Sequence, residues 1–184
     1  MVQDLVKVSM KKTILSLFSF LLVSFFLSQA WALEYQHARK NFSLTIPEKW
    51  EFVSDFKGTA LIAFQPSEGD KDSFRENMNV YIHSLSSLGL TTGPEVLNQY
   101  VQRNTEKNKR QLYGFKVLGQ KKITVQGQPA VQVEATHKMQ GLNLKVLVVY
   151  FVKGELAYSV TGSALENRYD EFKPAFEKMA SSFK

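Results

Sequence analysis

Residues 142–163 carry the strongest hydrophobic pattern of the chain, and they read LNLKVLVVYFVKGELAYSVTGS. Residues 146–152 are apolar at odd and even positions alike, which is typical of a strand covered on both faces of its sheet. Lys153, Gly154 and Glu155 supply a turn. Apolar residues then alternate with small or polar ones over residues 156–161, so the returning strand is less deeply covered. The pattern predicts a β-hairpin around which the rest of the sheet is arranged.

Shorter apolar runs predict the other strands of this sheet. The first, at residues 42–46, alternates with period two and ends at Pro47, which has no backbone N–H to donate. The next residues, 48–50, are expected to form a turn. The remaining predicted strands cover residues 59–65, 78–83, 115–118 with 121–125, and 131–139. Gly119 lies between two strand-like pieces and predicts a bulge there.

Two segments have the spacing of amphipathic helices. Residues 94–112 begin with Pro94 and Glu95, which suit a first helical turn, and continue with an apolar stripe at three- and four-residue steps. After residue 163 a heavier stripe follows, made of Tyr169, Phe172, Phe176, Met179 and Phe183. Pro174 lies either in the first turn of this second helix or at a kink, and the sequence leaves both open.

The predicted order is therefore three strands, a helix, four strands and a helix. Runs of adjacent strands with short connections favour an α+β fold with a mostly antiparallel sheet. Because the middle strand is apolar on both sides, we expect a three-layer αβα sandwich with one helix on each face of about six to seven strands. Residues 33–184 are predicted to be a single domain.

The N-terminal segment has the features of a secretory signal peptide. Two lysines precede an apolar run from residue 14 to residue 27, and Ala30-Trp31-Ala32 follows with small residues at the cleavage positions. The run is shorter than the roughly 20 residues of a spanning helix. We predict cleavage near Ala32, with residues 1–32 as the leader and a periplasmic or secreted product. Met10 is an alternative start to Met1.

Composition narrows the chemistry further. The 184 residues contain no cysteine, which excludes disulfides, thiolate metal sites and a lipid-modified cysteine. The formal charge is +6 over the whole chain. Beyond the leader 20 basic side chains face 16 acidic ones, a mild excess that suits anionic surfaces but predicts no nucleic-acid binding without a clustered basic face.

A family resemblance rests on four short motifs. They are Phe42-x-Leu-x-Ile-Pro47-x-x-Trp50, Gly127-Gln-Pro-Ala130, the long hairpin, and Phe176-Glu-x-Met179-x-x-Ser182-Phe183. Together they resemble the PsbP-like/DcrB superfamily over about residues 40–184. The resemblance implies an αβα sandwich, a role in binding other macromolecules, and no catalytic residue set. The chain departs from the lipoproteins of that superfamily because it has no cysteine to acylate.

Residue motifs of common active sites are missing from the sequence. It contains no Gly-x-Ser-x-Gly elbow, phosphate-binding loop or dinucleotide-binding glycine turn. The three histidines, His37, His83 and His137, lack the spacings of common zinc sites. They are either strand-end residues or, if distant segments converge, metal ligands. The acidic residues Glu68, Asp70 and Asp72 lie in one loop and are interpreted as solvated charges, with no cofactor expected.

Two surface features offer alternatives to a purely structural interpretation. Arg103, Lys107 and Arg110 lie on one side of the first predicted helix, either as a solvated face or as a docking surface for an acidic partner or anionic lipid. Trp50 and the aromatic residues that follow it either pack in the core or line a ligand groove.

These observations predict an exported, non-catalytic binding or accessory protein of the cell envelope, with a protein partner there. The alternative is a periplasmic carrier or sensor of a small apolar ligand held between the sheet and a helix. A hydrolase with a site assembled from dispersed residues is a third hypothesis.

Overall fold

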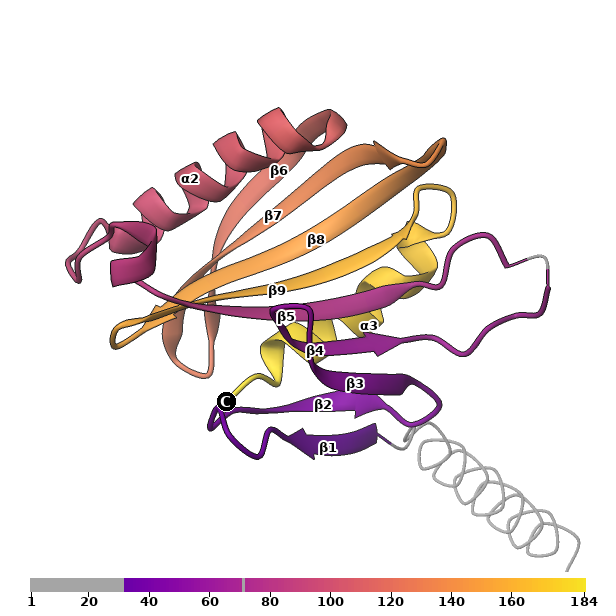
Figure 1. Cartoon of the computed structure of the whole chain (residues 1–184), viewed down its shortest axis with the longest axis horizontal. Helices are drawn as coiled ribbons and strands as arrows, with labels where there is room; N and C mark the ends of the chain where they lie inside the picture. Colours follow the sequence, from indigo (N-terminus) through magenta and orange to yellow (C-terminus); the bar gives the residue numbers. More distant parts are fainter. Residues whose placement is uncertain (1–31, 71) are drawn as a thin grey trace, which may run out of the picture. The chain divides into compact units, whose positions relative to one another are not determined.

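A seven-stranded antiparallel sheet forms the middle layer of the structure, in the order β3-β4-β5-β9-β8-β7-β6 (Figure 1). Tight hairpins join most of the neighbouring strands, the usual short connection between antiparallel strands. The strands are β3 (Glu51–Phe56), β4 (Thr59–Phe64), β5 (Asn77–Ser84), β6 (Tyr113–Val125), β7 (Gln128–Met139), β8 (Leu142–Lys153) and β9 (Leu156–Leu165). The predicted α+β class and antiparallel sheet are confirmed.

The computed structural model describes residues 32–70 and 72–184. The predicted leader, residues 1–32, therefore lies outside the described residues except for Ala32. Within the described part of the chain, no helix is long and apolar enough to cross a membrane.

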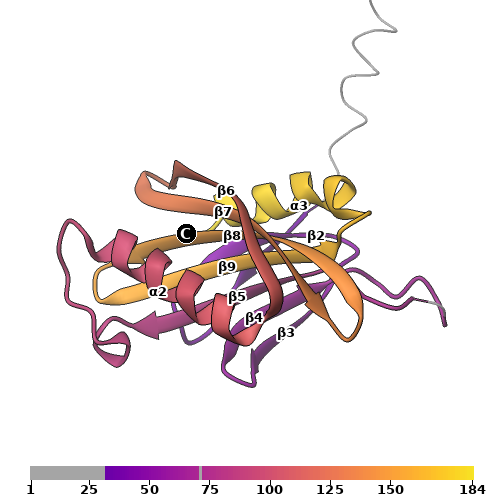
Figure 2. The same ribbon diagram turned by 90° about the horizontal axis from the view of Figure 1, so that it is seen from above.

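Two helices cover opposite faces of the sheet, as predicted (Figure 2). Helix α2 (Val96–Gln111) lies over β6, β7 and β8, and a short 3-10 turn, η1 (Ser86–Leu88), precedes it. Helix α3 (Tyr169–Ser181) packs on the other face against β8 and β9. Pro174 is the sixth residue of α3 and is exposed, so it lies in the body of the helix and not in its first turn.

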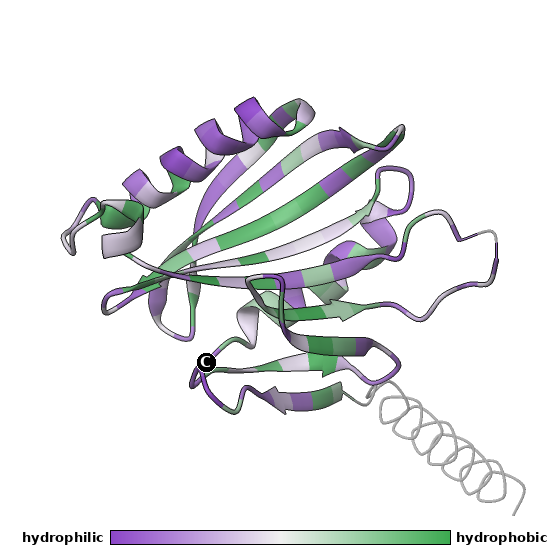
Figure 3. Ribbon diagram, viewed as in Figure 1, coloured by the Kyte–Doolittle hydropathy of each residue, from purple (hydrophilic) through white to green (hydrophobic). Residues whose placement is uncertain are grey.

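Strand β8 explains why the sheet needs a layer on each side. Leu147, Val149 and Phe151 belong to the core under α3, whereas Val146 and Val148 belong to the core under α2. Figure 3 shows β8 as a nearly continuous apolar band. Since successive side chains of a strand point to opposite faces, apolar residues at both parities bury both faces.

The sequence placed one strand in the wrong sheet and missed two others. Residues 42–46 do form a strand, β2 (Ser43–Pro47), but it pairs with β1 (Ala32–Gln36) in a separate two-stranded sheet. Leu44 and Ile46 of β2 are fully buried in the α3-side core. The edge of the main sheet is instead β3, whose six residues are all exposed. An exposed edge strand has no buried face to impose a period-two pattern, so the sequence carries no signal for it.

The cover provided by α2 is incomplete. It lies over β6, β7 and β8, while the same face of β3 and β5 keeps Val53 and Tyr81 at 43% and 36% exposure. The α2 layer therefore covers the half of the sheet that contains β8 and leaves the same face of the half that contains β3 open to solvent.

Candidate functional site

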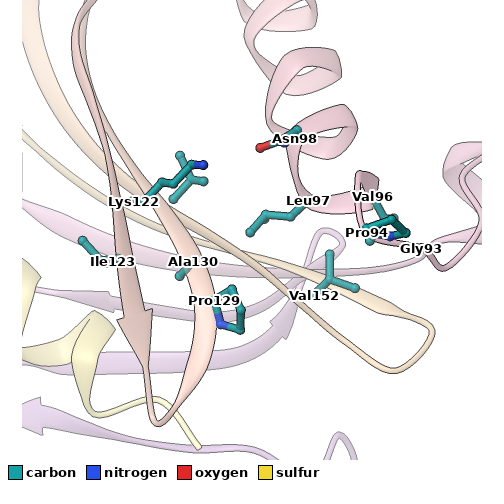
Figure 4. Close-up of a pocket in the computed structure, with 11 residues that line it drawn as sticks. Gly93, Pro94, Val96, Leu97, Asn98, Lys122, Ile123, Pro129, Ala130 and Val152 are labelled. Carbon is teal, nitrogen blue, oxygen red and sulfur yellow. The ribbon is translucent and has the colours of Figure 1, made fainter.

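An apolar hollow lies between the first turn of α2 and the β6–β7 hairpin (Figure 4), and we call it the α2 groove. Its volume is about 410 Å³, near the lower end of the roughly 300–1,000 Å³ of small-molecule sites. It is lined by Gly93, Pro94, Val96, Leu97, Asn98, Lys122, Ile123, Pro129, Ala130, Val131 and Val152. Most of these side chains are aliphatic, so the groove offers a water-poor surface.

The groove exists because α2 has few residues that anchor it. Only Val96, Tyr100 and Val101 of its sixteen residues are buried, and the Tyr100 ring meets the Tyr150 ring edge-on at 5.5 Å. Such a narrow stripe fixes the helix axis over β6, β7 and β8 and leaves a gap beside its first turn. Leu97 points into this gap (Figure 4) and is only half-buried.

One part of the groove is polar. The Lys122 amine and the Asn98 amide oxygen both point into it (Figure 4). Lys122 is opposite Val131 in the β6–β7 register, which places it on the α2 face. Asn98 donates from Nδ2 to Glu95 Oε2 at 2.8 Å, which leaves its Oδ1 as an acceptor. Among the described residues no carboxylate lies within 4.0 Å of the Lys122 amine, so its charge is available to a ligand.

The lining limits what the groove can do chemically. Lys122 is its one ionisable side chain, and none of the lining residues is a serine, threonine, histidine or carboxylic acid. In active sites a base or nucleophile is commonly paired with a second ionisable group that activates it, and the groove's lining holds no such pair. The lining therefore has the character of a binding surface.

The basic residues predicted to share one face of α2 have different surroundings in the structure. Arg103 donates from Nη1 to the Leu88 carbonyl and from Nη2 to the Gly89 carbonyl, the second at 3.3 Å. It therefore holds η1 against the helix. Lys107 and Arg110 are exposed, and their use as a docking surface stays a prediction.

The predicted histidines do not come together. In residues 32–70 and 72–184, no group of three His, Asp or Glu side chains could hold a metal ion. His37 is buried, and its Nδ1 accepts backbone N–H groups of Arg39 and Lys40 at 3.1 and 3.2 Å. Its Nε2 lies 3.4 Å from Asp55 Oδ1. Because its Nδ1 already accepts these two N–H groups, that nitrogen is not available as a base. His37 instead links the β1–β2 connection to Asp55 near the β3–β4 turn.

Asp55 is the charged centre of that junction. Hydrogen bonds from Arg39 and Lys40 lower the pKa of Asp55 to about 2, with Nη2 of Arg39 at 2.6 Å and Nζ of Lys40 at 3.1 Å. The carboxylate thus ties the β1–β2 connection to the β3–β4 turn.

A second charged cluster was not foreseen from the sequence. Arg168 forms a bidentate pair with Glu68, at 2.7 and 3.1 Å, and its Nη1 lies 3.4 Å from Oε2 of Glu76. The Glu76 side chain is 1% exposed, and its Oε1 has no hydrogen-bond partner among the described residues. Burial raises the pKa of the Glu76 carboxyl. Glu68, interpreted above as a solvated charge, is instead a partner of Arg168.

The aromatic residues near β3 separate into two groups. Trp50 packs beside Phe172 and Phe176 of α3, with ring centroids 6.5 and 6.2 Å apart. Phe52 and Phe56 stay 40% and 46% exposed on β3. Trp50 is thus partly buried against the α3-side core, and these aromatic residues are not among those that line the α2 groove.

The lining of the α2 groove could not be predicted from the sequence. Its lining comes from three stretches, near residues 93–98, 122–131 and 152, and none of them carries a ligand-binding motif. The available signal was indirect, since a 16-residue helix with a thin apolar stripe cannot cover four long strands.

Comparison with known protein families gives one match, and it covers the whole described domain. The family model PsbP matches residues 32–184. The chain belongs to the PsbP family. The family predicted from the four sequence motifs is thereby confirmed. Comparison with curated proteins gave no match.

Solved structures share the fold of this PsbP-family protein at low sequence identity. Cyanobacterial PsbP (CyanoP) from Synechocystis sp. PCC 6803 has a TM-score of 0.58 and 18% identity, covering 86% of this chain and 95% of its own. LpqN from Mycobacterium tuberculosis has 0.61 and 14%, covering 84% and 90%. PA94 from Pseudomonas aeruginosa has 0.53 and 19%, covering 79% and 91%. At such identities the likeness concerns the fold alone.

Proposed function

We propose that this chain is an exported, non-catalytic binding protein of the cell envelope and that it binds through the α2 groove. The observation that carries the proposal is the groove's lining, which is almost entirely aliphatic and contains a single ionisable group. Two further points support the envelope setting. Residues 10–32 have the sequence pattern of a signal peptide, and LpqN, which shares the fold, is involved in cell envelope biogenesis.

Export is tested by expressing the full chain in a bacterial host and measuring the intact mass of the product in the periplasmic and cytoplasmic fractions. We expect a periplasmic species that begins at Leu33. A full-length product that stays in the cytoplasmic fraction would contradict export.

Binding through the groove is tested with a photo-crosslinking amino acid placed at Leu97. The matched control carries it at Gln99, which is exposed on the same helix. We expect the Leu97 position to give a discrete adduct in envelope extracts and the Gln99 position to give none. Equal adducts at both positions, or none at either, would remove the groove as the binding site.

A second candidate function is favoured by the size of the groove. A volume of about 410 Å³ with an aliphatic floor suits a small apolar ligand, so the protein would act as its carrier or sensor. Native mass spectrometry of protein purified from its own host distinguishes the two functions. A retained mass of a few hundred daltons favours the carrier, whereas a protein adduct at Leu97 favours the accessory role.

A further inference from the structure

The polar and apolar parts of the α2 groove together define a class of ligand. We infer that the groove binds a single aliphatic chain that ends in a carboxylate, with the carboxylate on Lys122 and the chain along the aliphatic floor. This inference rests on the proposed binding function of the same groove and adds the chemistry of its occupant.

The floor selects for an aliphatic chain. Leu97 of α2, Val131 of β7 and Val152 of β8 come from three elements and belong to the same apolar cluster on the α2 face of the sheet, and Figure 4 shows Leu97 and Val152 beside this space. A chain laid on them loses contact with water, which is favourable in proportion to the apolar area buried. The volume of about 410 Å³ has room for one such chain and not for the two of a phospholipid.

The polar end selects for one negative charge. Lys122 is the only charged residue of the lining, and its amine has no carboxylate partner within 4.0 Å in the described part of the chain. Asn98 Oδ1 points into the same space and is an acceptor. One ammonium balances the single charge of a carboxylate, whereas a phosphate monoester brings a further charge that no other group of the lining balances.

The adjacent lysine provides a control within the same strand. Lys121 is opposite Gln132 in the register, on the α3 face of the sheet, and its amine lies 3.9 Å from Glu177 Oε1. Replacing Lys121 or Lys122 by glutamine removes the same charge from the molecule. Only Lys122 lines the groove.

The test is isothermal titration calorimetry of sodium decanoate into protein purified after expression of the full chain. We expect one saturable site, and octanoate binding about tenfold or more weakly, because each buried methylene contributes about 0.8 kcal/mol. Lys122→Gln should weaken decanoate about tenfold, as loss of a charge-assisted contact does, and Lys121→Gln should leave it unchanged. Leu97→Glu should abolish binding, with Gln99→Glu on the same helix as its control.

Three results would overturn the inference. They are the absence of saturable decanoate binding, equal losses for the two lysine variants, and binding of decyltrimethylammonium or decyl phosphate at least as tight as that of decanoate. The crosslinking experiment keeps the two proposals apart. A protein adduct at Leu97 together with no decanoate binding would refute the carboxylate ligand and leave the binding function standing.

Discussion

Helices α3 and α2 cover the same sheet from opposite sides, and they do so with different completeness. Five of the 13 residues of α3 are buried, including Tyr169, Phe172 and Phe176, whereas only three of the 16 residues of α2 are buried. Gly162 of β9 lets α3 approach so closely that a Cβ there would lie 2.3 Å from the Phe176 ring. The α3 side is therefore the structural core, and the α2 side is where a binding site can form without loss of the fold.

The largest test of this difference removes the central aromatic ring of α3. Phe176→Ala should lower the free energy of unfolding by about 3–5 kcal/mol, the usual cost of such a cavity. Leu97→Ala on α2 should cost less than about 1 kcal/mol, because Leu97 borders a space that is already open. Urea denaturation of both variants measures the contrast. Similar losses for the two would mean that α2 is as tightly packed as α3.

A second test fills the close approach between β9 and α3. Gly162→Ala places a methyl group against the Phe176 ring and should cost about 1–3 kcal/mol, as overpacking does. The penalty should shrink in a Phe176→Leu background, because a smaller side chain leaves room for the added methyl. A double-mutant cycle from urea denaturation gives this coupling, and purely additive losses would argue against the contact.

The stability contribution of the buried Glu76 carboxyl should depend on pH. Because the pKa of Glu76 is raised in the folded protein, the folded state binds more protons than the unfolded state above about pH 4.5. The contribution of Glu76 to the free energy of unfolding therefore falls as the pH rises from about 4.5 through the raised pKa of the folded state. Glu76→Gln should raise the free energy of unfolding more at pH 7 than near pH 4, because the neutral amide has no ionisation that burial disfavours. An equal gain at both pH values would show that the buried charge is not the cause.

The smallest expected effect concerns the basic face of α2. Arg103→Gln removes the hydrogen bonds to the Leu88 and Gly89 carbonyls and should cost about 0.5–1 kcal/mol. Lys107→Gln should leave stability unchanged, since Lys107 is exposed. Thermal melts compare the two, and hydrogen exchange of residues 85–92 reports whether η1 loosens in the Arg103 variant. Only Lys107 and Arg110 are then clean probes of a docking role.

The main features of the fold could be predicted because a strand buried on both faces has consecutive apolar residues in its sequence. Val146, Leu147 and Val148 are consecutive apolar residues, and such a run predicts a strand between two layers. The stripe from Tyr169 to Phe183 likewise predicted α3. Strand β3 was missed because edge residues such as Val53 and Ser54 face solvent on both sides and carry no alternation.

The candidate site was not readable for a different reason. Its lining joins Leu97, Lys122 and Val152, which meet only after three elements have packed. The basic spacing of Arg103 and Lys107 was correct on the helix, yet the partners of Arg103 are carbonyl groups 14 and 15 residues earlier. Spacing along one helix cannot show which groups a neighbouring loop brings to it.

The pairing of β2 with the last residues has a consequence for how the protein folds. Ser43 and Lys184 exchange two backbone hydrogen bonds, and the Thr45 amide donates to Ser182 Oγ across a separation of 137 residues. These contacts join residues about 140 positions apart, and contacts so distant in sequence form slowly. We therefore expect the docking of β2 against residues 182–184 to be among the last steps of folding, after the hairpins of the main sheet have formed.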